Sequence, residues 1–95
     1  MLDDKWKLLI KQTVQKYLGN DVQVFLFGSR ATGTNRKWSD VDVGIVAGQK
    51  IAGDKMVEIE SELSESDIPY LVDVVDFQSV NPDFAKVALS SKIDL

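Results

Sequence analysis

The sequence predicts a small α/β (α+β) domain, in which helices flank a small mixed β-sheet in the order αβ(α)βαβα. Three short apolar segments rich in β-branched and aromatic residues alternate with segments that carry apolar residues at helical spacing. A helix between the second and third strands favours a right-handed crossover, and therefore a parallel pair of strands. The length of 95 residues leaves room for one domain, which we expect to span residues 1–95.

The first half of the chain is predicted to form a helix, a strand and a polar corner. Residues 3–18 carry apolar side chains at helical spacing, and Gly19 follows as a stop signal. Residues 22–27 have the composition of a buried strand. This strand ends at Gly28 and Ser29, and a short helical turn is expected after them.

The second half is predicted to add two strands and two helices. In the strand at residues 40–46, three aliphatic residues share one face and two aspartates share the other. An amphipathic helix follows at residues 54–66, and Pro69 closes the connection to a third strand at residues 70–77. Residues 82–95 are expected to form a last helix.

Composition excludes several classes of chemistry. The chain has no cysteine and no histidine, which rules out disulfides, the usual zinc sites and catalysis by a serine–histidine pair. The net charge is −4 and the eleven basic residues form no dense run, so DNA is not an expected partner. No apolar stretch approaches the roughly 20 residues that cross a bilayer, and no signal peptide is evident, so we expect a cytoplasmic protein without membrane contact.

Three aspartates are predicted to meet at one end of the sheet. If the first two strands are antiparallel, the corner at Gly28 lies beside Asp40, and the parallel crossover then brings Asp73 toward Asp40 and Asp42. Unpaired carboxylates on one face repel one another and lose solvation, so a cation is expected to neutralise them. Oxygen ligands favour magnesium, here as two ions, with manganese as an alternative. Asp76 is a nearby alternative for the third position.

The corner after the first strand is predicted to bind phosphate. Gly28 lets the backbone approach a phosphate closely, and Ser29 offers a hydroxyl and a backbone N–H. Arg30 and Arg36 are the nearest cations; we assign nucleotide binding to Gly28, Ser29 and Arg30, and Arg36 stays an alternative. The segment is not a P-loop, because the required lysine and hydroxyl residue are absent after the second glycine.

Gly28-Ser29, ten intervening residues and then Asp40-Val41-Asp42, with an aspartate on a following strand, resemble the nucleotidyltransferase superfamily that includes DNA polymerase β. The longer string GSRATGTNRKWSDVDVGIV is similar to its small prokaryotic branch, the minimal nucleotidyltransferase (MNT) domain proteins. The resemblance covers nearly the whole chain and implies the nucleotidyltransferase fold.

The resemblance implies roles for the motif residues. Asp40 and Asp42 would bind both metal ions, Asp73 would bind one ion and act as general base, and Gly28 and Ser29 would hold the triphosphate. The implied reaction moves a nucleotide, expected to be AMP from ATP, onto a hydroxyl. In this branch the acceptor can be a tyrosine of a HEPN-domain toxin, for which the MNT protein is the antitoxin.

Two other functions are open at this stage. The chain is a candidate for a non-catalytic module that neutralises a partner protein by contact alone, and two-metal nucleases use similar carboxylates. The Gly28-Ser29 corner and the acidic composition argue against a nuclease. Larger relatives add a second domain that shapes the acceptor site, so the acceptor site here is expected to be either shallow or completed by a partner protein. The sequence leaves the oligomeric state open, including a homo-oligomer.

Overall fold

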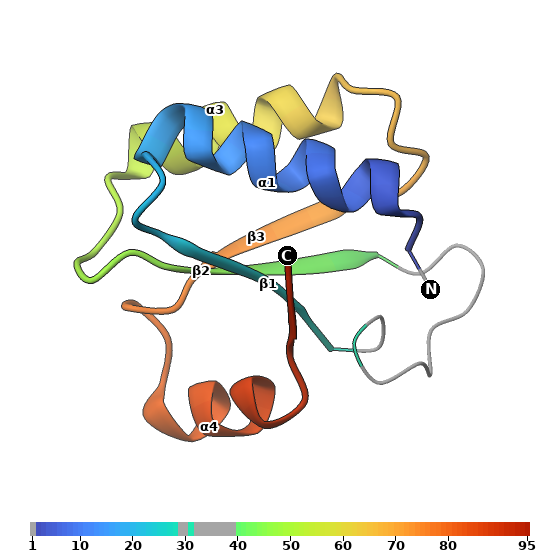
Figure 1. The fold of residues 1–95 in the computed structure, drawn as a ribbon. Helices are drawn as coiled ribbons and strands as arrows, with labels where there is room; N and C mark the ends of the chain where they lie inside the picture. Colours follow the sequence, from blue (N-terminus) through green and yellow to red (C-terminus); the bar gives the residue numbers. More distant parts are fainter. Residues whose placement is uncertain (1, 29–30, 32–39) are drawn as a thin grey trace.

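The computed structural model describes residues 2–28, 31 and 40–95, and its centre is a mixed four-stranded sheet in the order β3-β2-β1-β4 (Figure 1). β1 (Gln23–Phe27) pairs antiparallel with β2 (Val41–Val46), and β2 pairs parallel with β3 (Val72–Asp76). Both strand directions predicted from the sequence are therefore confirmed, as is the mixed α/β class. None of the described helices is long and apolar enough to cross a bilayer.

Helices α1 (Asp4–Leu18) and α3 (Gly53–Ser64) cover one face of the sheet (Figure 1). Their buried residues pack on the aliphatic side chains that alternate along the strands, and this core includes Ile10, Val14, Val41, Val43, Ile45, Ile59 and Leu63. The side chains of Lys16 and Tyr17 on α1 both donate hydrogen bonds to the Glu62 carboxylate on α3, at 2.7 and 2.8 Å. These contacts fasten the two helices together on the side away from the sheet.

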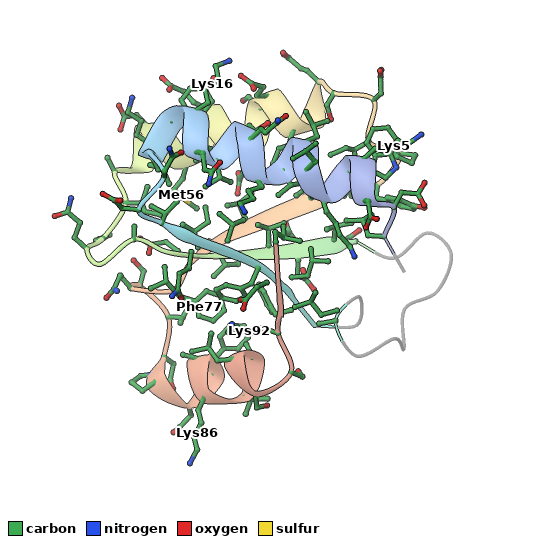
Figure 2. All side chains as sticks on the ribbon, viewed as in Figure 1. Lys5, Lys16, Met56, Phe77, Lys86 and Lys92 are labelled. Carbon is green, nitrogen blue, oxygen red and sulfur yellow. The ribbon has the colours of Figure 1, made fainter. Side chains whose placement is uncertain are left out.

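Helix α4 (Pro82–Ser90) covers the opposite face, over a small aromatic core (Figure 1). Phe25 and Phe27 of β1 and Phe77 pack there with Ala88 of α4, and Phe77 lies between the sheet and the helix (Figure 2). Gly44 on β2 makes room for the rings, since a Cβ at this position would lie 2.4 Å from the ring of Phe25. The odd-numbered side chains of β1 and β3 and the even-numbered ones of β2 point to this face.

The prediction of one helix over residues 82–95 is wrong at its C-terminal end. α4 stops at Ser90, and β4 (Ile93–Asp94) pairs antiparallel with β1. The backbone N–H of Leu95 also donates to the carbonyl of Val24 at 2.9 Å. Without this short strand, β1 would be an edge strand with open backbone groups, and pairing with β4 satisfies part of that edge.

Candidate active site

Asp42 and Asp73 lie directly opposite each other on neighbouring parallel strands. The register pairs Asp42 on β2 with Asp73 on β3, and Phe27 on β1 with Asp42. Paired residues point to the same face, and neighbouring strands are about 4.8 Å apart, so the two carboxylates share one end of the α4 face. Asp40 precedes β2 and is exposed. Folding therefore places Asp42 between β1, which ends at Phe27 just before Gly28, and the strand that carries Asp73.

The electrostatics of Asp42 show how closely the acidic groups interact. Partial burial raises the pKa of the Asp42 carboxyl above its ordinary value, and the negative charges of Asp73 and then Asp40 raise this pKa further. Both causes disfavour the charged carboxylate. A cation bound at this place would relieve the repulsion among the three groups.

The donor set fits a hard divalent cation such as magnesium. Every side-chain donor here is a carboxylate oxygen, which is the ligand type that magnesium prefers. Within residues 2–28, 31 and 40–95, no group of three acidic, histidine or cysteine side chains is gathered closely enough to hold an ion by itself. Magnesium commonly takes only one or two protein carboxylates and completes its shell with water and substrate phosphate oxygens. The donor chemistry and the electrostatic coupling of Asp42 to Asp73 therefore fit a divalent cation at this pair of carboxylates.

Gly28 closes the site on the side of β1. Its φ of +71° lies in the left-handed region that favours glycine, and a Cβ here would lie 2.6 Å from Oδ2 of Asp42. The N–H of Ala31 donates to the Gly28 carbonyl at 3.1 Å, which turns the chain after the strand. The predicted nucleotide ligands Ser29 and Arg30, and the alternative Arg36, lie outside the described residues.

Gly28→Ala is expected to lower catalytic activity far more than Gly48→Ala does, by about 10-fold or more. Gly48 has a similar φ of +78°, and no atom lies within 4 Å of a Cβ added there. The alanine therefore strains the backbone to a similar extent in both variants, by about 1–2 kcal/mol. Only Gly28→Ala also displaces the Asp42 carboxylate, and small misplacements of reacting groups have large kinetic costs. Thermal denaturation and initial rates of both variants check this prediction. Equal activity in the two variants would show that contact with Asp42 is unimportant.

The alternative third aspartate, Asp76, lies elsewhere. It pairs with Ile45, three residues farther along the sheet than Asp73, and points to the α1/α3 face. Its buried carboxylate accepts hydrogen bonds from the N–H of Ile51 at 2.8 Å and of Gln78 at 2.9 Å, and from the hydroxyl of Ser79 at 3.3 Å. Asp76 therefore holds neighbouring segments of the fold together by hydrogen bonds, and Asp73 is the aspartate of β3 that lies beside Asp42.

Two hollows adjoin the aspartate pair on opposite sides. One, of about 500 Å³, runs between α3 and the edge strand β3, and Leu71, Val72 and Asp73 are among the residues that line it. The other, of about 340 Å³, lies between the end of β1 and α4, where Gly28 and Asp42 form part of its wall. The sequence predicted a helix in this part of the chain and gave no indication that some of its residues line a hollow beside Asp42.

Comparison with known proteins gives consistent results at the level of family and fold. The family model described as "Polymerase beta, Nucleotidyltransferase" matches residues 9–95. The probable protein adenylyltransferase MntA of Haemophilus influenzae is 32% identical over 81 residues, which cover 85% of this chain and 71% of that protein.

Similar solved structures share the fold over nearly the whole chain. A crystal structure of a toxin–antitoxin with AMP-PNP matches with a TM-score of 0.75 at 20% identity, covering 98% of this chain and 72% of that one. A structure of the tri-AMPylated Shewanella oneidensis HEPN toxin in complex with an MNT antitoxin matches with a TM-score of 0.63 at 20% identity, covering 93% and 70%.

Proposed function

This chain belongs to the polymerase beta nucleotidyltransferase family, and we propose that it transfers AMP from ATP to a tyrosine hydroxyl of a HEPN-domain toxin, acting as its antitoxin. The observation that carries the proposal is the placement of Asp42 directly opposite Asp73, with Gly28 against the Asp42 carboxylate. The relative MntA, a probable protein adenylyltransferase, supports the transfer of AMP to protein. The complex of an AMPylated HEPN toxin with an MNT antitoxin supports the choice of partner.

The proposed site separates the two substrates. Asp40 and Asp42, with Gly28, Ser29 and Arg30, bind the triphosphate end of ATP. The exposed Asp73 stands at the hollow beside β3, where a hydroxyl group of a second protein has access. Asp40, Asp42 and Asp73 would hold magnesium together with the triphosphate, and the bound ion would neutralise charge and polarise the phosphate oxygens.

The proposed chemistry is a single in-line displacement. The tyrosine oxygen attacks the α-phosphorus and forms the new P–O bond while the bond to the bridging oxygen of the β-phosphate breaks. Pyrophosphate leaves with the bonding electrons, and the carboxylate of Asp73 accepts the proton of the hydroxyl as general base. Asp42, held between the neighbouring strands, fixes the geometry of the α-phosphate against Asp73. ATP is a cytoplasmic metabolite, and the cytoplasm is where we place the reaction.

Intact-mass measurement tests the proposal. The chain is mixed with magnesium, ATP and the HEPN-domain protein encoded beside it, and the masses of both proteins are recorded. We expect one or more AMP units on the HEPN protein, none in a parallel reaction with Asp73→Asn, and loss of toxicity in step with the modification. Neutralisation of the toxin by a stable complex without any added mass would contradict the proposal and favour a contact inhibitor.

A further inference from the structure

The hollow between the end of β1 and α4 combines an apolar wall with direct access to Asp42. Phe27, Gly28 and Asp42 line it from the sheet, and Phe84, Val87 and Ser91 line it from α4 and the residue that follows. Most of the surface that lines it is apolar, and the hydroxyl-bearing Ser91 is exposed at this place. A cavity of about 340 Å³ is within the size range of small-molecule sites.

Phe84 is an exposed aromatic ring in a fixed position. The Phe84 ring makes an edge-to-face contact with Phe27, with ring centroids 5.9 Å apart at 90°, and it lies tilted against Phe77, with ring centroids 6.0 Å apart at 38°. Even so, 46% of the residue is accessible, and the neighbouring Val87 is 71% exposed. In contrast, Lys86 on the same helix points away from the sheet (Figure 2). The aromatic core therefore holds the Phe84 ring from one side and leaves the rest of it open to a ligand.

We propose that this hollow binds the base of the nucleoside triphosphate, with Phe84 as the surface on which the base stacks. The inference rests on the proposed function, which puts the triphosphate at Gly28 and Asp42. Only the ribose separates a base from its α-phosphate, so the base must lie next to these residues, and both of them line this hollow. A base has flat apolar faces and a polar edge, which match the Phe84 ring and the Ser91 hydroxyl.

The two hollows then bind different substrates. The hollow at α4 takes the base, and the hollow at β3 is left for the acceptor, because Asp73 lines that one and Asp42 lines the other. The α-phosphate lies between them at the aspartate pair. The acceptor hydroxyl would then approach the phosphorus from the side of β3, and in-line displacement requires the pyrophosphate to leave on the side of the phosphorus opposite to that hydroxyl.

Binding measurements with two probes test the inference on the whole chain. The probes are ATP and inorganic tripolyphosphate, each with magnesium, and their dissociation constants are measured by calorimetry for the unaltered chain, Phe84→Leu and Phe84→Tyr. Leucine keeps the apolar packing and removes the stacking surface. We expect Phe84→Leu to weaken ATP binding by about 5- to 150-fold, the range for loss of one base–aromatic stack, with tripolyphosphate binding unchanged. Phe84→Tyr keeps an aromatic ring at this position, so we expect it to bind ATP with the affinity of the unaltered chain.

A matched control and the contrary outcomes complete the experiment. Val57 is also an exposed apolar residue, 62% accessible, and it lies on α3, which contributes no residue to the hollow at α4, so Val57→Ala should leave both affinities unchanged. Unchanged ATP binding by Phe84→Leu, or an equal loss for both probes, would overturn the inference alone; in the second case Phe84 only supports the fold. A chain that binds neither probe would overturn the proposed function together with this inference.

Discussion

Asp42→Asn is expected to reduce AMP transfer by more than about 100-fold and, at the same time, to stabilise the metal-free protein. We expect this loss of activity to exceed the 10- to 100-fold loss typical of residues that only hydrogen-bond to metal ligands, because Asp42 is itself a proposed ligand. The gain in stability follows from the electrostatics, since burial and the charges of Asp73 and Asp40 disfavour the Asp42 carboxylate. Solvent screens a carboxylate that is only partly buried, so we expect a gain of order 0.5 kcal/mol, or about 2–4 °C in Tm.

The pH dependence of this gain has a definite sign. The folded-state pKa of Asp42 is raised above its ordinary value of 3.8, so the folded chain binds this proton more tightly than the unfolded chain. The metal-free wild type therefore loses stability as the pH rises from 3.8 through the raised pKa, and Asp42→Asn does not. Thermal denaturation in EDTA at pH 3.5 and pH 7 checks this: the two proteins should differ only at the higher pH.

A chemically identical substitution at an exposed site provides the control. Asp67 is exposed in the connection between α3 and β3, and Asp67→Asn is expected to change neither the rate nor the melting temperature. An Asp42→Asn protein that transfers AMP at the normal rate would remove this carboxylate from the chemistry. A variant with lower stability than the wild type in EDTA at pH 7 would contradict the electrostatic account.

Asp76→Ala is expected to destabilise the fold by about 2–4 kcal/mol and to leave the rate per folded molecule nearly unchanged. The buried carboxylate accepts from two backbone N–H groups and one hydroxyl, all of which would lose their charged partner. This is a large fraction of the roughly 5–14 kcal/mol expected for a chain of this size. Urea unfolding measures the loss, and rates are corrected for the folded fraction.

Asp73→Ala is the matched comparison on the same strand. Asp73 is exposed and Asp76 is 8% exposed, so the first substitution should cost activity and little stability, the reverse of the second. If Asp76→Ala lost activity while remaining fully folded, the catalytic role assigned to Asp73 would have to be reconsidered. The pair thus distinguishes a chemical role from a structural role for two aspartates that lie three residues apart.

Local patterns in the sequence were sufficient to predict most of the fold. The alternation along residues 40–46 gave the strand and its two faces, because side chains in a strand point to opposite sides. The helix between the second and third strands gave their parallel pairing, because such crossovers have one hand. The short strand β4 was not predicted, since two residues have no detectable period and their pairing with β1 depends on where α4 ends.

The sequence by itself determined the chemistry that is available: carboxylates without histidine or cysteine, spaced so that two of them share a strand face and follow a glycine corner. Only the tertiary structure shows which aspartate of β3 lies beside Asp42. Asp73 and Asp76 are the same residue type, and they differ in strand register and in hydrogen bonding. The tertiary structure also shows that Phe84, which the sequence presents only as an apolar residue of a helix, lines the hollow beside Asp42. Residue types and spacing are local properties, whereas register and the docking of α4 depend on contacts between segments far apart in the chain.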